Sequence, residues 1–276
     1  MSVIMETKNR HILLVMAIMI AISGIYWSCA TVPITGRRQL SLVPESELMA
    51  MSYTQYNQFL EEHKISQNQE QVDMVKRVGE RIASAVEKYF EQKGWSDQFA
   101  NFQWEFNLIE DDTPNAWCMP GGKVVFYTGI LPITQNEEGL AVVMGHEIAH
   151  AVAKHGSERM SQQIGIQFGA VALSALLSEK PEETQNLYLA AYGVTSQVGL
   201  MLPYSRKHEH EADRLGLIFM AMAGYNPSVA VDFWQRMAQL SQGGSPPAFL
   251  STHPSDQARV NYIREVLPEA LEYYNP

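Results

Sequence analysis

The sequence His-Glu-Ile-Ala-His at residues 146–150 constrains the fold of this chain more than any other feature. In an α-helix, residues four apart lie on one face about one turn from each other, so both imidazoles can bind the same metal ion. Glu147 then lies beside the metal, where it can accept and return a proton. The flanking residues 142–153 are mostly apolar, which predicts a helix buried in a core. A helix with two hydrogen-bonded histidines and a solvated glutamate is the alternative that needs no metal.

The composition is that of one globular domain. Of the 276 residues, 46% are hydrophobic, which is enough for a sizeable core. The formal net charge of −10 is spread along the chain, and no basic patch is visible, so nucleic acid is not an expected partner. The two cysteines are Cys29 and Cys118. A chain processed at Cys29 therefore has no internal disulfide and depends on its core and any metal for stability.

The first thirty residues have the features of a targeting signal. Lys8 and Arg10 precede an apolar run at 12–27, which is short for a membrane span of about 20 residues. The sequence Tyr-Trp-Ser-Cys at 26–29 resembles a bacterial lipobox, in which the cysteine becomes the lipidated first residue of the mature protein. We therefore predict a lipoprotein-type signal peptide at 1–28 and lipidation of Cys29. An uncleaved amino-terminal anchor is the alternative.

Both interpretations of the amino terminus place the rest of the chain beyond the inner membrane of a bacterium. Ala30 follows Cys29 where an aspartate could stand, and by resemblance to lipoprotein sorting in enterobacteria this favours the outer membrane. We therefore predict a lipid-anchored protein of the bacterial cell envelope that faces the periplasm. Residues 29–44, which include two prolines, are predicted to form an extended lipid-anchored tether before a single domain at 45–276.

The first part of this domain predicts two framework helices and a small sheet. Apolar residues at helical spacing predict helices at about 45–63 and 68–92. The alternating residues 103–109 predict a half-buried strand, and 123–128 predict a second strand. The Pro-Gly-Gly sequence at 120–122 limits strand pairing, which favours an edge position. An edge strand beside the predicted helix that carries His146 and His150 can hold an extended peptide by strand addition. An ordinary hairpin explains the pattern equally well.

Three further helices are predicted in the middle of the chain. Thr134 and Glu137 form a capping-box pattern, so the helix that carries His146 and His150 is predicted at about 135–156. The segment 161–178 is apolar and rich in small residues, but it has too few apolar positions to span a bilayer. We predict a buried or lid helix there, followed by another helix at about 184–201.

A zinc hydrolase needs three protein ligands and an open position for water, so a third ligand must lie elsewhere in the chain. His155 is nine residues after His146, half a turn out of phase on a continuous helix, and is therefore predicted to point away from the metal. A glycine at 153 and a histidine at 156 would mark a metzincin, but alanine and glycine occupy these positions. That subclass is excluded.

A second acidic cluster offers better candidates for the third ligand. Glu209 and Asp213 are four residues apart, so one carboxylate can bind the metal while the other orients a ligating histidine. Glu211 lies about 200° around the helix from Glu209 and is not expected to share this role. His208 and His210 are weaker alternatives, because neither aligns with Asp213. The alternative for this acidic cluster is the solvated, charged first turn of a helix that binds no metal.

Together these motifs resemble those of the zinc metallopeptidases of the HtpX and CAAX prenyl protease 1 family. The first is the motif at 146–150, and the second, about sixty residues later, is Ser205-Arg206 followed by Glu209-x-Glu211-Ala212-Asp213-x-x-Gly216. The resemblance covers about residues 45–265 and includes Asn115-Ala116, Pro120-Gly121-Gly122, Gly129-Ile130-Leu131 and Ser251-Thr252-His253-Pro254. The lipoprotein-type signal and the absence of multiple predicted spans make the chain similar to the periplasmic BepA/LoiP branch and to the mitochondrial Oma-type proteases.

The resemblance implies a zinc metallopeptidase domain with a zincin-like fold of the α+β, mainly α, class, in which the edge strand of a small sheet flanks the active-site helix. It implies one zinc ion per chain bound by His146, His150 and Glu209, with Glu147 as general base. It also assigns supporting roles to Asp213 beside a ligand, to Asn115 and Ala116 at the start of the substrate-binding strand, and to Arg259 near the site. His253 would lie near the zinc, where it either stabilises the transition state or occupies the open position and holds the enzyme inactive.

The expected function is endoproteolysis of misfolded or misassembled cell-envelope proteins, that is, proteolytic quality control. The expected partners are these unfolded substrates and a membrane reached through a lipid on Cys29, and the oligomeric state is left open. The main alternative is an envelope chaperone or assembly factor with a latent zinc site, which a closed site with His253 on the metal would suit. A small-molecule zinc hydrolase is a third possibility, which the predicted edge strand disfavours.

Overall fold

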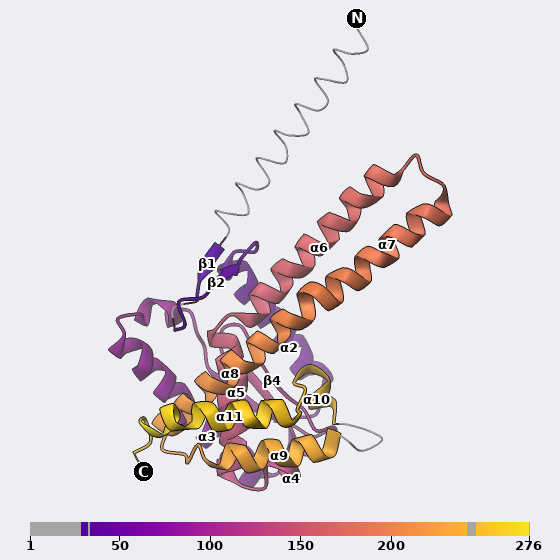
Figure 1. Ribbon diagram of the computed structural model, residues 1–276. Coiled ribbons are helices and arrows are strands. Elements are labelled where there is room, and N and C mark those ends of the chain that lie inside the picture. Colours follow the sequence, from indigo (N-terminus) through magenta and orange to yellow (C-terminus); the bar gives the residue numbers. More distant parts are fainter. Residues whose placement is uncertain (1–28, 33, 242–246, 276) are drawn as a thin grey trace, which may run out of the picture.

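The computed structural model describes residues 29–32, 34–241 and 247–275 (Figure 1). Within this part of the chain, the structure is mainly helical and contains a three-stranded and a two-stranded sheet. The predicted α+β, mainly α, fold class is thereby confirmed. The predicted signal peptide at 1–28 lies outside the described residues and stays a prediction.

The strands all lie in the first half of the chain, and the second half is helical. The strands are β1 (Cys29–Thr31), β2 (Arg38–Leu40), β3 (Glu105–Ile109), β4 (Ala116–Met119) and β5 (Lys123–Tyr127). The α-helices are α2 (Glu45–Glu62), α3 (Gln69–Gln92), α4 (Leu131–Thr134), α5 (Glu137–Val152), α6 (His155–Leu177), α7 (Glu182–Ser196), α8 (Leu202–Met222), α9 (Val229–Ser241), α10 (Ala248–Thr252) and α11 (Gln257–Leu271). Three shorter segments are the 3-10 helices η1 (Ser96–Phe99) and η2 (Thr128–Ile130) and the π-helix η3 (Gln197–Met201).

The three-stranded sheet has the order β3-β5-β4, with β5 parallel to β3 and antiparallel to β4. All five residues of the central strand β5 are buried, whereas three of the four residues of β4 are only half-buried. The chain turns from β4 into β5 at Gly121 and Gly122, whose φ angles of 84° and 86° favour glycine. The predicted edge strand is therefore β4, and it contacts α5.

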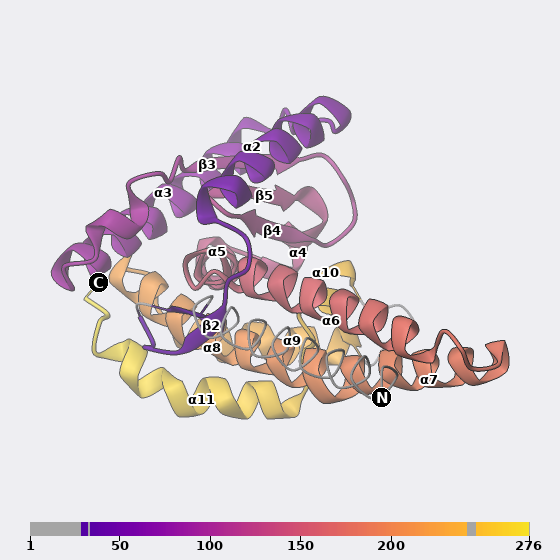
Figure 2. The ribbon, with the colours of Figure 1, turned by 90° about the horizontal axis from the view of Figure 1, so that it is seen from above.

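Helix α5 forms the centre of the core. Figure 2 shows it between two layers, with the sheet, α2 and α3 on one side and α8, α9 and α11 on the other. Every residue from Gly139 to Val152 is buried, which agrees with the apolar sequence around the histidines. Because the helix is covered on all sides, its polar side chains are largely removed from bulk water.

The backbones of α5 and α8 are in direct contact at two glycines. A Cβ atom added to Gly145 would lie 2.6 Å from the carbonyl oxygen of Gly216, and one added to Gly216 would lie 2.8 Å from the carbonyl carbon of Gly145. No other residue fits at either position without separating the helices. This contact brings the histidines of α5 next to the acidic residues of α8.

Helix α5 is shorter at both ends than the sequence predicted. Its amino-terminal cap is Asn136, whose side chain accepts a hydrogen bond of 2.9 Å from the Gly139 amide, and not Thr134. Its carboxyl end is at Val152, because Lys154 adopts a left-handed conformation with φ of 58° and redirects the chain into α6. The predicted continuous helix at 135–156 is thus wrong, and His155 belongs to the next helix.

The predicted extended tether at 29–44 is a docked β-hairpin. Strands β1 and β2 pair antiparallel, and Arg37 beside β2 forms ion pairs with Glu158 at 2.7 Å and Glu211 at 2.9 Å. The amide of Leu42 donates a hydrogen bond of 2.9 Å to the Ser161 hydroxyl. The segment is ordered against the domain because two buried carboxylates need a cation. Lipidation of Cys29 is not tested and stays a prediction.

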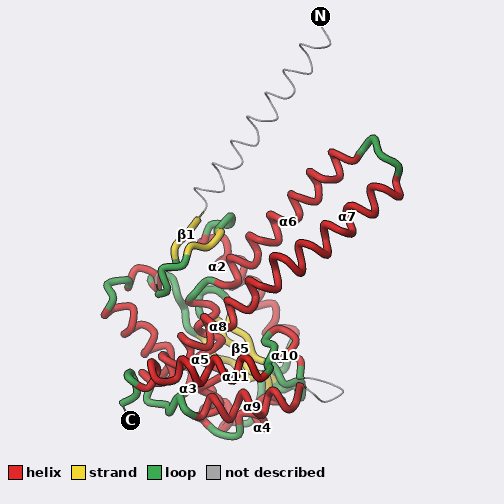
Figure 3. Tube along the Cα trace, viewed as in Figure 1, coloured by secondary structure: helices red, strands yellow, loops and turns green. Residues whose placement is uncertain are grey.

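Helices α6 and α7 form a hairpin that projects from the domain (Figures 1 and 3). A helix is present as predicted at 161–178, but only 11% of the most apolar 18-residue window of α6 is buried, so the buried alternative is wrong and the lid alternative stays a prediction. In the described part of the chain, α6 is the one helix long and apolar enough to cross a membrane. It exceeds the predicted length because the chain becomes helical again at His155, before the apolar run begins.

The contact between α5 and α8 can be tested with Gly145→Ala. We expect the added methyl group to lower the free energy of unfolding by about 2 kcal/mol or more, because the nearest atom is backbone and cannot rotate away. Gly165→Ala on α6 is the matched control, since no atom lies within 4 Å of its added Cβ, and it should be neutral or stabilise by up to about 1 kcal/mol. Denaturant unfolding measures both, and equal stability of the two variants would contradict the close contact.

Candidate metal centre

Six buried polar side chains at the centre of the core come from three parts of the chain. Helix α5 contributes His146, Glu147 and His150, helix α8 contributes Glu209 and Asp213, and the residue after α10 contributes His253. All six side chains are buried. Such a concentration of ionisable groups in an apolar core is unfavourable unless the groups pair with each other or bind a cation.

Four of these residues converge on one point. One ligand atom each from His146, His150, Glu209 and His253 lie within 4.8 Å of one another. His146 Nε2 is 3.0 Å from His150 Nε2 and 3.3 Å from Glu209 Oε2, and His150 Nε2 is 3.4 Å from Glu209 Oε1. The predicted ligands His146, His150 and Glu209 are therefore brought together.

The cluster fits a zinc ion. Nitrogen and oxygen atoms bound tetrahedrally at about 2.1 Å lie about 3.4 Å apart, close to the separations found here. Two imidazole nitrogens that face each other can share one proton at most, so a converging set of lone pairs favours a cation. Glu209 Oε1 is buried without a hydrogen-bond partner among the described residues, and a bound ion would satisfy it.

Asp213 fixes the orientation of His146. Its Oδ1 atom accepts a hydrogen bond from His146 Nδ1 at 2.9 Å, which leaves Nε2 facing the cluster. Asp213 in turn accepts two hydrogen bonds from Arg259, of 2.9 Å from Nε and 2.7 Å from Nη2. The guanidinium lies 3.4 Å from the centre of the Trp234 ring and 3.0 Å from Glu209 Oε2. Arg259 thus balances the charge of both carboxylates.

His150 is oriented by a residue that the sequence placed elsewhere. The Nδ1 atom of His155 lies 2.8 Å from Nδ1 of His150, and its Nε2 donates to Glu211 Oε2 at 3.0 Å. As predicted, His155 is not one of the four clustered residues, but the prediction that it points away was wrong. That prediction assumed an unbroken helix, whereas the left-handed Lys154 turns His155 back towards His150. Lysine carries no signal for that conformation. Glu211 also lies outside the cluster, as predicted, and contacts His155 instead of a ligating histidine.

The weaker candidate ligands lie outside the cluster. His208 Nε2 bonds to Glu158 Oε2 at 2.9 Å, and its ring stacks on that of His155. His210 stacks on the ring of Tyr262, with 4.0 Å between ring centroids. Both histidines therefore have other partners.

His253 belongs to the cluster itself. Its Nδ1 atom is 3.1 Å from both His146 Nε2 and Glu209 Oε2, and its Nε2 atom is 3.3 Å from Glu147 Oε1. The ring packs against Phe249, with 4.6 Å between ring centroids. His253 thus contacts both the candidate ligands and the candidate general base.

The protonation states follow from burial and pairing. Burial alone would lower the pKa of His146, but hydrogen bonds to Asp213 and Glu209 outweigh it and raise this pKa to about 9. Burial lowers the pKa of His150, so that ring is neutral. Despite burial, hydrogen bonds from the surrounding histidines hold the pKa of Glu209 far below its usual value. Burial raises the pKa of Glu147.

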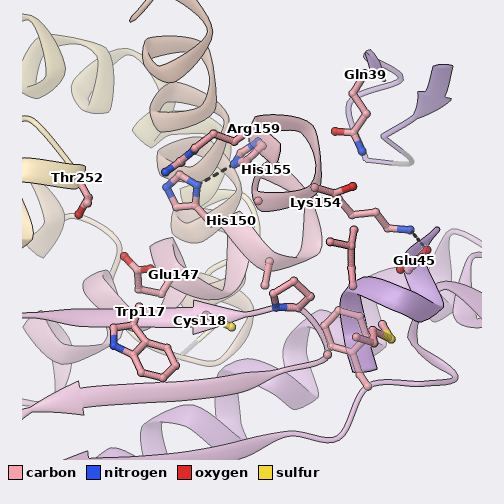
Figure 4. A pocket seen from close by; sticks show the side chains of 18 of the residues that line it. Gln39, Glu45, Trp117, Cys118, Glu147, His150, Lys154, His155, Arg159 and Thr252 are labelled. Atoms are coloured by element: carbon pink, nitrogen blue, oxygen red, sulfur yellow. Dashed lines mark hydrogen bonds and ion pairs between the residues drawn. The ribbon is translucent and has the colours of Figure 1, made fainter. Parts of the chain in front are cut away.

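A cavity of about 350 Å³ opens beside the cluster (Figure 4). Its walls include Glu147 and His150 from α5, His253, and the predicted substrate-binding residues Asn115 and Ala116. Figure 4 shows Trp117 and Cys118 of β4 below Glu147, with Lys154, His155 and Arg159 on the opposite side. Burial raises the pKa of the Cys118 thiol well above its usual value, so it is protonated and a poor nucleophile.

Comparison with known proteins identifies the family. A family model described as "Peptidase family M48" matches residues 74–267, and the chain belongs to this family. It is 34% identical over 269 residues to the mitochondrial metalloendopeptidase OMA1 of Schizosaccharomyces pombe, covering 95% of this chain and 74% of the relative. It is 31% identical to the mitochondrial metalloendopeptidase OMA1 of Homo sapiens, covering 87% and 46%. A putative beta-barrel assembly-enhancing protease of Vibrio cholerae is 33% identical, covering 58% and 34%.

These findings confirm two predictions and overturn one. The chain is a metalloendopeptidase and its metal is zinc. The predicted location in a bacterial cell envelope is contradicted, because the relatives that match most of the chain are mitochondrial proteins. The apolar run before Cys29 does not by itself decide the location, because apolar amino-terminal segments serve several destinations. The chain spans less than half of the length of the human relative.

The pKa of His146 predicts that zinc binding releases a proton. At pH 7.5, below about 9, His146 of the metal-free chain is protonated, and it must lose this proton to bind metal, whereas His150 and Glu209 are already deprotonated. Calorimetric titration with zinc in buffers of different ionisation enthalpy should show release of about one proton per ion. Release should fall as the pH rises through about 9 and vanish well above it. A binding enthalpy independent of the buffer at pH 7.5 would contradict the assignment.

Proposed function

We propose that this family M48 metalloendopeptidase cleaves extended segments of unfolded or misassembled proteins. The observation that carries this proposal is the edge strand β4, which begins at the wall of the cavity that also contains Glu147 and the metal cluster. Backbone groups on the open side of an edge strand can pair with an extended peptide without regard to its sequence. Folded proteins present few free extended segments, so this mode of binding favours unfolded ones.

In this proposal, His146, His150 and Glu209 hold the zinc ion. When bound, the ion polarises the scissile carbonyl group and increases the acidity of water. Glu147 accepts a proton from the attacking water and transfers it to the leaving amine. Burial raises the pKa of Glu147, which moves it towards the pH range where a carboxyl group can both accept and release a proton. Asp213 and His155 hold the two ligating imidazoles in position.

His253 supports a second candidate function. Its ligand atom lies within 4.8 Å of those of the other three residues, so it can occupy the position that a zinc hydrolase leaves open for water. Its contact with Glu147 engages the general base at the same time. A chain held in this state would bind unfolded proteins without cutting them, as a chaperone or assembly factor with a latent zinc site.

The relatives support a role in protein quality control. The name of the Vibrio cholerae protein describes a putative enhancer of β-barrel assembly that is also a protease. We propose that this chain likewise acts on misassembled proteins, recognised by their exposed extended segments.

Glu147→Gln should remove peptidase activity and leave zinc binding intact. The amide keeps the shape of the side chain but cannot accept the proton, so cleavage of an unfolded protein such as reduced casein should fall by about 100-fold to 10,000-fold. Glu110→Gln is the control, because Glu110 is an exposed glutamate paired with Lys64. Gel-based cleavage assays and zinc analysis of both variants check this. Undiminished cleavage by Glu147→Gln would exclude the mechanism, and no cleavage by the unaltered chain would favour the latent-site alternative.

His253→Ala should increase the rate of cleavage. Removing the ring opens the fourth position at the cluster and frees Glu147, so we expect turnover of unfolded casein to rise several-fold. The double variant Glu147→Gln, His253→Ala should be inactive, which shows that the gain depends on the same site. A lower rate in His253→Ala would show that His253 assists the reaction instead of closing the site.

A further inference from the structure

The projecting hairpin of α6 and α7 exposes an unusual amount of apolar surface. In the described part of the chain, every large apolar side chain that is more than half exposed lies on this hairpin or on η3 beside it. Phe168 is 71% exposed and Val171 68% on α6, and Val194 is 66% exposed on α7. Exposed large apolar residues elsewhere in the described chain reach at most 44%, and Met51 is 40% exposed. Contiguous apolar surface of this kind marks an interaction site.

Charged residues are confined to the two ends of the hairpin. Between Arg159 and Glu179, and again between Glu183 and Arg206, no residue is aspartate, glutamate, lysine or arginine. The tip, residues 179–183, has the sequence Glu-Lys-Pro-Glu-Glu. A solvated surface hairpin of this length would normally carry charges throughout, so their absence from both helices points to an apolar environment.

The dimensions match a lipid bilayer. The charge-free part of α6, residues 160–177, is about 27 Å long at 1.5 Å per residue, compared with about 30 Å for the hydrocarbon core of a bilayer. The second charge-free stretch, 184–205, is helical throughout, including the π-helix η3. Both segments are therefore long enough to cross the same hydrocarbon layer.

The two helices hold each other in a form that suits a membrane. Tyr192 on α7 donates a hydrogen bond of 3.1 Å to the carbonyl of Ile166 on α6, and its hydroxyl occupies the space over Gly169. Small residues that permit close approach are typical of helix packing in membranes. Because both segments are helical, their backbone groups need no hydrogen bonds from water.

The described chain begins at the base of this hairpin. Arg37 and Leu42, on either side of β2, bond to Glu158 and Ser161 at the start of α6. The apolar run at 12–27 precedes β1 directly in the sequence. A membrane that holds this run would therefore lie next to the base of the hairpin, and one bilayer can accommodate both.

We infer that α6 and α7 insert as a helical hairpin into a lipid bilayer, with the residues 179–183 at its far surface. The alternative occupant is a second copy of this chain, packed on the same apolar surface. The bilayer accounts for the length of the charge-free segments and for charges at both ends, which a protein partner would not require. The inference extends the predicted amino-terminal attachment to a second membrane contact inside the catalytic domain.

Insertion would place the catalytic cavity at the membrane surface. Arg159, the last charged residue before the apolar part of α6, lines the cavity together with Lys154 and Gly156. Segments that emerge from the bilayer would then be close to β4 and Glu147. This consequence rests on the proposed function, whereas the insertion itself does not.

The test is depth-dependent fluorescence quenching in the full chain. An environment-sensitive fluorescent amino acid is incorporated by codon suppression at Val171 or Val194, near the middle of the two charge-free segments, and at Met51 as the matched exposed control. Each chain is reconstituted into phosphatidylcholine vesicles with bromine atoms on the acyl chains, either near the headgroup or near the bilayer centre. We expect a blue shift at 171 and 194, with stronger quenching by the deep bromines, and neither effect at 51.

Every other outcome overturns the inference. Emission at 171 and 194 that stays at the wavelength of the water-exposed probe would show that the hairpin remains outside the bilayer. A blue shift without vesicles that rises with protein concentration, together with a dimer in sedimentation analysis, would assign the surface to a second copy. The same measurement in the Glu147→Gln chain keeps the question separate from peptidase activity, because insertion should be unchanged there.

Discussion

The backbone contact between Gly145 and Gly216 is the constraint on which the rest of the structure depends. Any side chain at either position would push α5 and α8 apart. At the separation that the glycines allow, His146 and His150 reach Glu209 and Asp213. The other layers then cover this helix pair, with β4 and α3 packed on α5 and α11 packed on α8. The contact between α5 and α8 thus lies at the centre of the fold, with the other elements packed around it.

The burial of several carboxylates in the core is unfavourable, and a bound metal ion would offset this cost. Glu147, Glu209 and Asp213 are buried together, and Arg259 is the buried guanidinium that contacts both Asp213 and Glu209. One arginine and the proton held by His146 only partly balance three carboxylates. A divalent cation at the converging ligand atoms completes the balance, so metal binding and the stability of the core are expected to be linked. The ion that the chemistry requires therefore also balances the charge of the buried carboxylates.

The sequence was sufficient wherever the function depends on spacing within one helix. The four-residue intervals of His146 with His150 and of Glu209 with Asp213 predicted both halves of the cluster, and the glycines after Pro120 predicted the edge strand. It failed where a single backbone angle decides, because Lys154 in the left-handed region turns His155 back towards His150 and ends α5 early. It also failed for the docked hairpin at 29–44 and the projecting α6, since the partners of Arg37 and the exposure of α6 depend on contacts between distant segments.

The central claim is that His146, His150 and Glu209 hold one zinc ion beside Glu147. The most direct measurement is anomalous X-ray diffraction from crystals of the zinc-loaded chain, with data collected on both sides of the zinc absorption edge. We expect one strong anomalous peak per chain, within bonding distance of those three side chains. A zinc peak at another position, or a crystal of the loaded chain without any peak between α5 and α8, would contradict it.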